Sequence, residues 1–407
     1  MAILKKTLRN GVRILIEPNS IVQSASLGIW CHTGSKNEQD DEAGITHLIE
    51  HMLFKGTPRR TAKEIAEAIE GRGGLLNAFT DKEVTCYYAR ILAEDVENAF
   101  DVLSDMVLNS LIDPEELQRE KNVVLEEIKR GEDEPGDHVH ELQLSHRWGQ
   151  HPLGKPIIGT SQSVSSFDRE AIVAYLDRRY RGGNLVVGVA GRVDPETFFD
   201  LVERTLGDLP AGGEAEPMEP PQPRSGRHEI RREVEQVHFC LGGETCSLYS
   251  PELHTAALLD AGLGGGMSSR LFQEVRERRG LVYSIGSYNM ATSLAGVFNV
   301  YGGTGLETWP EVQETIWAEF DKVRKSGFEA DELDRLKRNI RGNMVLALEA
   351  MSSRMRRMCQ NEIYHQRDIP VEETLAKFDA VTNEGILELA QRTLDPDQLT
   401  LTAIRPK

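Results

Sequence analysis

Two histidines and a glutamate interrupt the otherwise apolar stretch GITHLIEHMLF at residues 44–54. If the stretch is helical, a rotation of about 100° per residue places His47 and His51 about 40° apart on one face, with Glu50 beside them. Two imidazoles one turn apart can share a metal ion, and a carboxylate next to that ion can act as a general base. The alternative is a packed helix whose histidines bond to backbone or carboxylate groups. The spacing favours the metal site.

A third protein ligand is needed, and residues 113–130 offer one. This segment, DPEELQREKNVVLEEIKR, is predicted to form a helix. Glu120 and Glu127 are seven residues apart and therefore share the apolar stripe of that helix, where a carboxylate is costly unless it is paired or bound to a metal. An ion pair with Lys or Arg is the alternative for Glu120. Glu126 points about 100° away from Glu127 and is expected in solvent.

The composition describes an ordinary globular protein, with 39% hydrophobic and 28% charged residues among 407. A chain of this length usually forms two domains or more. The formal net charge of −18 argues against nucleic acid or an anionic membrane as a partner. No apolar run reaches the roughly 18 residues of a membrane span. The first residues lead directly into strand-like alternation around Asn10-Gly11 and do not look like a secretory signal.

The five cysteines are an odd number without a CxxC pair, which argues against both a disulfide framework and a thiolate metal site. Buried thiols in a reducing compartment suit this pattern. A cytoplasmic protein is therefore expected.

A proline-rich segment, PAGGEAEPMEPPQPRSGRH, divides the chain. Five prolines without a periodic apolar pattern are typical of an extended linker, here residues 210–228. We therefore expect an amino-terminal domain at residues 1–209, which carries the metal motif, and a carboxy-terminal domain at residues 229–407 without one.

The two halves resemble each other. A predicted helix at residues 329–348 corresponds to the one at 113–130, and each half closes on a strand, at 184–191 and 398–404. The expected fold class is α+β, with two similar, duplicated domains that each pack helices against a mainly antiparallel sheet.

These motifs, with others along nearly the whole chain, resemble the M16 inverzincin metallopeptidases, the family of pitrilysin, insulin-degrading enzyme and mitochondrial processing peptidase, in its short-chain branch. The segments that carry the resemblance include GSKNEQDDEAGITHLIEHMLFKGTPRR, REKNVVLEEI and GGGMSSRLFQEVRERRGLVYSIGSY. The resemblance implies the metallohydrolase fold shared by LuxS and processing peptidase. It also implies one Zn²⁺ per chain.

The family resemblance assigns roles to several residues. It implies that His47, His51 and Glu127 bind zinc, because 75 residues lie between His51 and Glu127 as in the family. Glu120 then supports the zinc site from outside its ligand set. Glu50 takes a proton from the attacking water and passes it to the leaving amine.

Two further pairs follow from the same resemblance. Arg276 and Tyr283 match an arginine and a tyrosine that the family directs at the scissile bond, and such donors stabilise an oxyanion. The alternative is a surface arginine and a core tyrosine. Asn77 and Ala78 match the strand edge that pairs with an extended substrate backbone. The alternative here is an ordinary hairpin strand.

Other features are expected to play no part in catalysis. His138, His140, His146 and His151 have no helical or paired spacing with a carboxylate, so we expect surface and loop roles. The glycine-rich segment at 262–270 lacks the ending of a phosphate-binding loop, and no GxSxG motif is present.

The sequence therefore predicts a zinc endopeptidase that acts on short or unfolded, extended peptides. The alternative is a noncatalytic partner subunit of a processing-peptidase-like complex, but such subunits usually lose the zinc residues. Because the long members of the family enclose substrate between two such double-domain halves, we expect a homodimer. Arg276 and Tyr283 then reach the zinc site of the other subunit.

Overall fold

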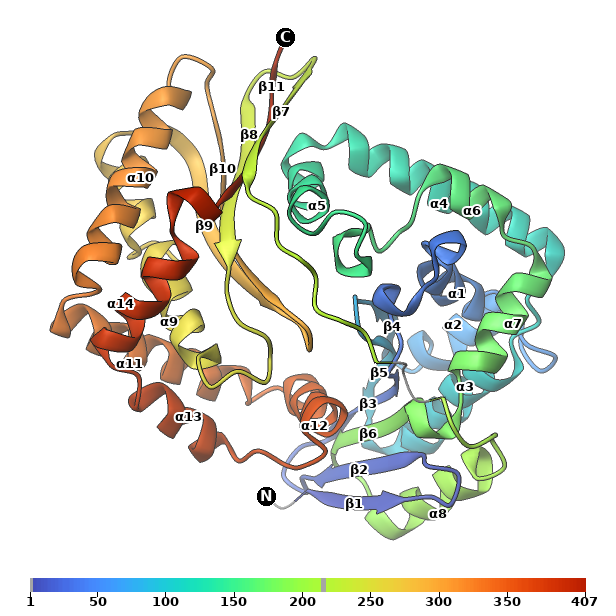
Figure 1. Ribbon diagram of the computed structural model, residues 1–407. Helices are drawn as coiled ribbons and strands as arrows, with labels where there is room; N and C mark the ends of the chain where they lie inside the picture. Colours follow the sequence, from blue (N-terminus) through green and yellow to red (C-terminus); the bar gives the residue numbers. More distant parts are fainter. Residues whose placement is uncertain (1–2, 214–216) are drawn as a thin grey trace. The chain divides into compact units, whose positions relative to one another are not determined.

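The computed structural model describes residues 3–213 and 217–407, which form two compact units. Unit 1 contains the residues up to Ile128, together with Pro156–Pro217 and Val345–Ile369. Unit 2 contains Lys129–Lys155, Met218–Met344 and Pro370–Lys407. Figure 1 labels the helices and strands of both units.

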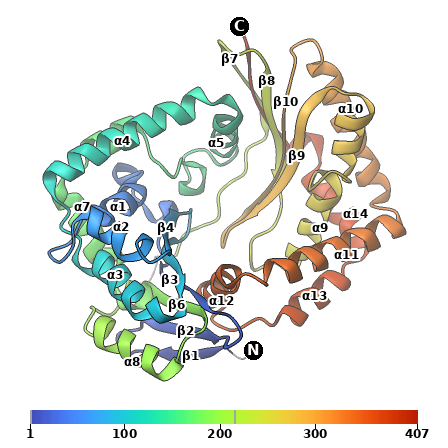
Figure 2. The same ribbon diagram turned by 180° about the vertical axis from the view of Figure 1, so that it is seen from behind.

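The described part of unit 1 holds a six-stranded sheet in the order β1-β2-β6-β3-β5-β4. Figure 2 labels all of these strands except β5. Only the pair β2 and β6 is parallel among these strands, and the other neighbours are antiparallel. The sheet is therefore mainly antiparallel, as predicted. Its strands are β1 (Leu4–Thr7), β2 (Arg13–Pro18), β3 (Ser24–Cys31), β4 (Leu75–Thr80), β5 (Thr85–Leu92) and β6 (Leu185–Gly191).

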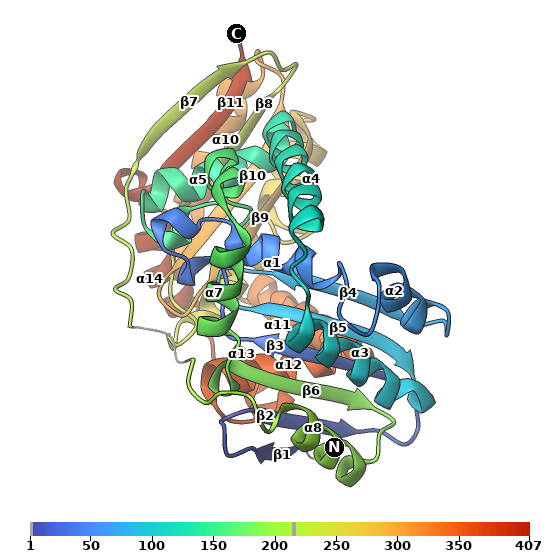
Figure 3. The same ribbon diagram turned by 90° about the vertical axis from the view of Figure 1, so that its right-hand side faces the viewer.

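Most helices of unit 1 cover one face of this sheet, and Figure 3 shows α3 and α8 in front of the strands with α12 behind them. Because side chains alternate along a strand, Ile14 and Ile16 face the larger helical layer while Leu15 faces the other way. The helices of the larger layer are α1 (Ile45–Leu53), α2 (Ala62–Glu70), α3 (Val96–Asn109), α4 (Pro114–Asp133), α6 (Ser161–Ser166), α7 (Arg169–Arg179) and α8 (Pro195–Leu206).

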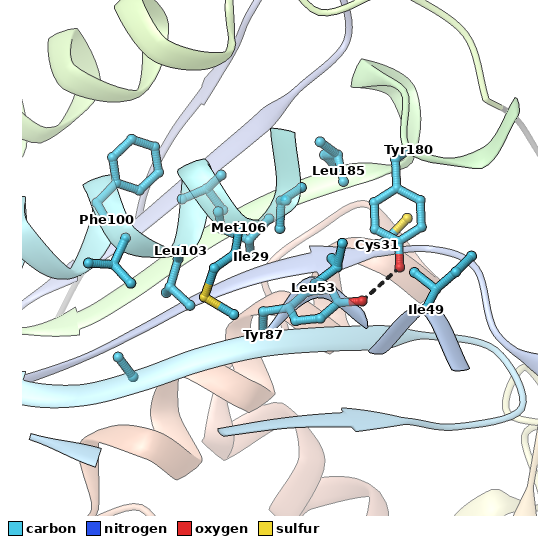
Figure 4. Close-up of a cluster of buried hydrophobic side chains, with 14 of the residues drawn as sticks. Ile29, Cys31, Ile49, Leu53, Tyr87, Phe100, Leu103, Met106, Tyr180 and Leu185 are labelled. Carbon is cyan, nitrogen blue, oxygen red and sulfur yellow. Dashed lines mark hydrogen bonds between the residues drawn. The ribbon is translucent and has the colours of Figure 1, made fainter. Parts of the chain in front are cut away.

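The core beneath the larger layer includes a buried pair of tyrosines (Figure 4). The phenol oxygens of Tyr87 and Tyr180 lie 2.9 Å apart, so one hydroxyl donates to the other. Burying a hydroxyl without a hydrogen-bond partner costs free energy, and this bond gives each of the two hydroxyls a partner. The metal motif on α1 packs against the same core through Ile49 and Leu53.

Helix α12 (Met351–His365) covers the second face of the sheet in unit 1. Its buried residues Met355, Met358 and Cys359 pack against Trp30 and Val186. Trp30 Nε1 donates to Met355 Sδ at 3.2 Å, which satisfies the indole in an otherwise apolar contact.

The described part of unit 2 holds a five-stranded sheet in the order β7-β11-β8-β10-β9. Its strands are β7 (Gly226–Arg232), β8 (Val237–Glu244), β9 (Val282–Ala291), β10 (Gly296–Thr304) and β11 (Thr400–Pro406). Phe239, Leu241 and Ala403 face a core that is closed by α9, α10 and α14. The remaining elements of this layer are α9 (Leu253–Leu263), the π-helix Phe272–Arg278, α10 (Trp309–Ser326), α11 (Ala330–Ala347), α13 (Val371–Asp379) and α14 (Asn383–Thr393).

Helix α5 (Pro135–Trp148) covers the second face of the sheet in unit 2. Val139 packs there against Cys240 and Ile404. Gln143 Nε2 donates to Asn299 Oδ1 and to Thr400 O, each at 3.0 Å. This face is therefore more polar than its counterpart in unit 1.

The units exchange one helix each, and this differs from the continuous domains 1–209 and 229–407 expected from the sequence. Helix α5 comes from the first half of the chain but belongs to unit 2, and α12 comes from the second half but belongs to unit 1. The physical reason is that both sheets have two buried faces, whereas hydrophobic periodicity does not say which sheet a helix will cover.

The predicted linker, residues 210–228, includes residues 214–216, which lie outside the described residues. Strand β7 begins at Gly226, inside the segment expected to be a linker. Within the described residues, no helix is long and apolar enough to cross a membrane. All five cysteines lie within those residues and are buried with free thiols, as expected.

The contact between β6 and α12 generates a first prediction. A Cβ on Gly188 would lie 2.1 Å from Cys359 Sγ, so Gly188→Ala should push α12 from the sheet and lower the free energy of unfolding by about 1–3 kcal/mol. Urea denaturation measures this loss. Adding Cys359→Ala removes the clashing sulfur, so the double variant should be more stable than the sum of the single effects. Strictly additive effects would contradict the contact.

Candidate metal centre

A glycine and a buried glutamate fix the start of helix α1. Gly44 precedes it with φ 90°, and a Cβ there would lie 2.4 Å from Ile158 O, so only glycine fits. The Glu38 carboxylate accepts from Gly44 N at 2.8 Å and from Thr46 N at 2.9 Å. Burial raises the pKa of Glu38 to about 7, although these amide bonds act in the opposite direction. Glu38 therefore satisfies amides at the start of the helix that carries both histidines.

The two histidines of α1 and Glu127 of α4 come together in unit 1. One ligand atom from each of His47, His51 and Glu127 lies within 4.8 Å of the other two. The imidazole centroids are 4.8 Å apart, and His51 Nε2 lies 3.8 Å from Glu127 Oε2. Within the described residues, this is the only group of three or more His, Cys, Asp or Glu side chains that meets the geometry for a metal ion.

His47 fits a metal ligand by its environment as well as its position. Its Nδ1 is buried and has no hydrogen-bond partner among the described residues. Burial lowers the pKa of His47 to about 4, and the charge of His51 acts in the same direction. The ring is therefore neutral near pH 7, and a neutral imidazole is the form that binds a metal.

Glu120 forms a hydrogen bond with the second histidine, His51. His51 Nδ1 donates to Glu120 Oε2 at 3.0 Å, and this leaves Nε2 for the side that faces Glu127. Lys55 Nζ lies 2.7 Å from Glu120 Oε1. Burial raises the pKa of Glu120, but the bonds from His51 and Lys55 outweigh it, so the carboxyl group stays ionised. Both expectations for Glu120 thus apply, since it makes an ion pair and also orients His51.

Glu50 lies on α1 between the histidines and is held by a residue that the sequence did not single out. Thr80 Oγ1 donates to Glu50 Oε2 at 2.5 Å. Burial raises the pKa of Glu50, and the bond from Thr80 opposes this. A raised pKa makes the carboxylate a better proton acceptor. Thr80 ends strand β4, and no pattern in the sequence links it to the motif 30 positions earlier.

Asn77 and Ala78 lie on β4, which is an edge strand of the unit 1 sheet. They stand opposite Tyr88 and Tyr87 of β5. The Ala78 N–H donates to the Asn77 side chain at 2.8 Å. A peptide that pairs with this amide must therefore displace the Asn77 side chain first.

Arg276 and Tyr283 belong to unit 2 and contact each other. The Arg276 guanidinium lies 5.7 Å from the centre of the Tyr283 ring and 4.6 Å from that of Phe272. Tyr283 is 84% exposed, so the alternative of a core tyrosine is wrong. Its phenol is open to a partner in solution.

Three of the remaining four histidines differ from their expected surface and loop roles, whereas His151 lies in a turn as expected. His138, His140 and His146 lie on helix α5. The His140 ring contacts the hydroxyl of Tyr288 at 3.1 Å. The His146 ring stacks on His228, with centroids 4.0 Å apart. They help to pack α5 on the polar face of its sheet, and His151 follows that helix in a short turn.

Known protein families match both halves of this chain. The family described as insulinase, peptidase family M16, matches residues 13–161. The family described as the peptidase M16 inactive domain matches residues 166–340. The chain belongs to peptidase family M16. Other M16 sequences are similar over nearly its whole length. The uncharacterised zinc protease YmxG of Bacillus subtilis is 39% identical over 99% of this chain and 98% of its own.

An uncharacterised zinc protease of Streptomyces coelicolor is 38% identical over 96% of this chain and 87% of its own. Two solved structures share the M16 fold. A peptidase M16 inactive domain from Pseudomonas fluorescens and a protease from Helicobacter pylori each superpose with a TM-score of 0.93 at 21% identity. Each covers 100% of this chain, and they cover 98% and 99% of their own chains respectively.

The different positions of three glutamates on α4 generate a second prediction. Glu127→Gln should abolish zinc binding because it removes a charged ligand. Glu120→Gln should weaken it by about 10- to 100-fold because it acts only through His51. The exposed Glu126→Gln is the matched control and should bind like the wild type. Mass spectrometry of metal content and competition with a chelator measure these effects. Loss of zinc from the Glu126 variant alone would refute the ligand set.

Proposed function

We propose that this M16 protein is a zinc-dependent endopeptidase that hydrolyses short or unfolded, extended peptides. The observation that carries the proposal is the approach of His47, His51 and Glu127 within 4.8 Å, with Glu50 on the same helix. Two imidazoles and one carboxylate are a ligand set typical of catalytic zinc sites. The names of its curated relatives, which describe zinc proteases, support the same activity.

The residues present fit a zinc ion. The buried and unpartnered Nδ1 of His47, the neutral state of that ring and the carboxylate of Glu127 supply donors that zinc prefers. One ion per chain is proposed, held by His47, His51 and Glu127. When bound, it supplies a Lewis acid that lowers the pKa of water and polarises a peptide carbonyl.

The protein's own residues perform the proton transfers. Glu50 accepts a proton from the attacking water and then donates it to the leaving amine. The bond from Thr80 orients the carboxylate for this task, and burial strengthens it as a base. Glu120 keeps the His51 ring in one orientation during both steps.

Strand β4 is proposed to bind the substrate. Within the described residues, one side of this edge strand has no neighbouring strand, and an extended peptide can add to it by backbone hydrogen bonds. Asn77 moves from the Ala78 amide and bonds to the peptide, and the small Ala78 leaves room for it. Recognition through the backbone tolerates many sequences but requires an unfolded segment.

A noncatalytic partner subunit is the alternative function. Such a subunit needs neither a complete ligand set nor a general base. The four residues His47, Glu50, His51 and Glu127 are all present, and this favours the endopeptidase.

We further propose that the working unit is a homodimer in which Arg276 and Tyr283 of one subunit complete the zinc site of the other. Their mutual contact and the exposed phenol of Tyr283 suit residues that act on a partner. A cation and a hydroxyl donor stabilise the negative charge that develops on the peptide oxygen. Cytoplasm is the proposed location, because five buried free thiols suit a reducing compartment.

A third prediction tests the general base. Glu50→Gln should keep its zinc and lose peptide cleavage by at least about 100-fold, because the amide cannot accept a proton. Cleavage of a fluorogenic peptide library, together with metal analysis, measures both effects. Glu126→Gln is the control for both. Retained turnover in the Glu50 variant would exclude the mechanism, and absence of cleavage in the wild type would favour the partner-subunit alternative.

A fourth prediction tests action between subunits. Glu50→Gln and Arg276→Ala chains, each weak alone, should regain cleavage when mixed, because a mixed dimer has one site with Glu50 and Arg276 both intact. Subunit exchange is verified by native mass spectrometry. No recovery after complete exchange would show that Arg276 does not act on the partner's site.

A further inference from the structure

Strand β4 presents two different faces to a peptide that adds to its edge. Side chains alternate along a strand, so Ala78 and Thr80 face α1, and Phe79 faces α12. The bond from Thr80 to Glu50 and the contact of Phe79 with Trp30 fix this assignment. The side chains of a paired peptide alternate in the same way. Every second peptide side chain therefore lies on the α12 face of the sheet, away from the candidate metal centre.

Helix α12 places a cation beside β4 on that face. The guanidinium carbon of Arg356 lies 5.3 Å from the centre of the Phe79 ring. Trp30 holds this ring edge-on, with the two ring centres 5.5 Å apart. Arg356 is exposed, and all three residues belong to unit 1. A guanidinium that stacks on an aromatic ring keeps the edges of its plane free for hydrogen bonds.

No acidic group of the protein competes for Arg356. Among the described residues, no carboxylate forms an ion pair with its guanidinium. The residues one turn away on the accessible side of α12 are Ser352, Ser353 and Gln360, which are all neutral. Exposed arginines without a partner are common on protein surfaces. Arg356 differs from them because an aromatic ring of the proposed peptide-binding strand fixes its position.

A peptide paired with β4 places one side chain directly across from Phe79. The Cβ atoms of facing residues in an antiparallel pair are about 4.5–5.5 Å apart and lie on the same face of the sheet. That peptide side chain therefore lies beside the ring that carries the Arg356 guanidinium. A carboxylate at this position can accept two parallel hydrogen bonds from the guanidinium. An ammonium group would be repelled there.

We propose that Arg356 selects an acidic residue, Asp or Glu, at the peptide position that faces Phe79. The inference rests on the proposed addition of an extended peptide to β4, and it narrows the substrate class to peptides with an acid at one fixed position. The formal net charge of −18 disfavours acidic peptides at long range. A preference for an acid therefore has to come from a local contact with a cation.

Peptide binding to the zinc-loaded Glu50→Gln chain tests the preference without cleavage. The probes are peptides of about ten residues, built from alanine, serine and glutamine and labelled with an uncharged fluorophore. Each position in turn carries Glu, Gln or Lys, and fluorescence anisotropy gives the dissociation constant. We expect the best Glu peptide to bind about 10-fold more tightly than its Gln counterpart, because it gains a charge-assisted contact. The Lys counterpart should bind more weakly than both.

Variants of Arg356 in the same Glu50→Gln chain test the location. Arg356→Ala should bind Glu and Gln peptides equally, and Arg356→Glu should prefer Lys over Glu, because the local charge is reversed. Unchanged affinity of Arg356→Ala for the Gln peptide shows that the strand edge is intact. The matched control is Arg338→Ala, which changes an exposed arginine on α11 and should keep the full preference.

Cleavage by the wild type gives the register of the bound peptide. Because β4 and the candidate zinc ligands both belong to unit 1, a peptide held at Phe79 has a fixed position relative to the zinc site. Mass spectrometry of the products should therefore find the preferred acid at a constant number of residues from the cleaved bond. An acid at variable distances from that bond would contradict a single position opposite Phe79.

Two kinds of failure are distinguished by these measurements. Equal binding of Glu and Gln peptides to the Glu50→Gln chain, or an unchanged preference in Arg356→Ala, overturns the role of Arg356 and leaves the proposed peptidase function in place. Binding of no peptide at millimolar concentration overturns the addition of substrate to β4, and the role of Arg356 with it.

Discussion

The central strands of both sheets bury apolar side chains on two faces, and each face needs its own helical cover. In unit 1, Trp30 and Val186 point away from the larger layer and are covered by α12. In unit 2, Cys240 and Ile404 do the same and are covered by α5. Because each cover comes from the opposite half of the sequence, neither sheet is complete until both halves of the chain are present. The duplicated fold is thus held together by a reciprocal exchange.

In unit 1, the candidate metal centre contains hydrogen-bonded polar side chains on helices that otherwise pack through apolar residues. Three contacts fix three separate groups: Glu38 at the start of α1, Glu120 behind His51, and Thr80 on Glu50. Each satisfies a polar atom that burial would otherwise leave unpaired. His47 Nδ1 is the exception, because it is buried and has no hydrogen-bond partner among the described residues.

Local patterns predicted much of the fold, and they brought the candidate metal-binding side chains onto the right helices. The helix expected at 113–130 is α4, and Glu120 is buried on its apolar stripe as predicted. The strand expected at 184–191 is β6. These predictions succeeded because they depend on periodicity over a few turns, which the backbone imposes. Glu127 was expected on the same buried stripe but is exposed, as Glu126 is.

The misses involve contacts between segments far apart in the sequence. Thr80, Lys55 and Glu38 are polar residues whose partners are set by tertiary packing, and nothing in their immediate neighbours distinguishes them from surface residues. The exchange of α5 and α12 was missed for the same reason. The histidines of α5 were assigned to the surface because the polar face that receives them lies on strands more than 70 residues later.

The edge of strand β4 can also pair with another molecule of the same protein. An unpaired strand edge accepts any extended chain of suitable length, and β4 of another molecule is such a chain. Leu75, which begins the strand, is half exposed and adds an apolar contact to such a pairing. The edge that is proposed to bind an unfolded peptide therefore also favours aggregation by strand pairing at high protein concentration. The Asn77 side chain accepts from the Ala78 amide, so that amide cannot pair with a second chain until the side chain moves.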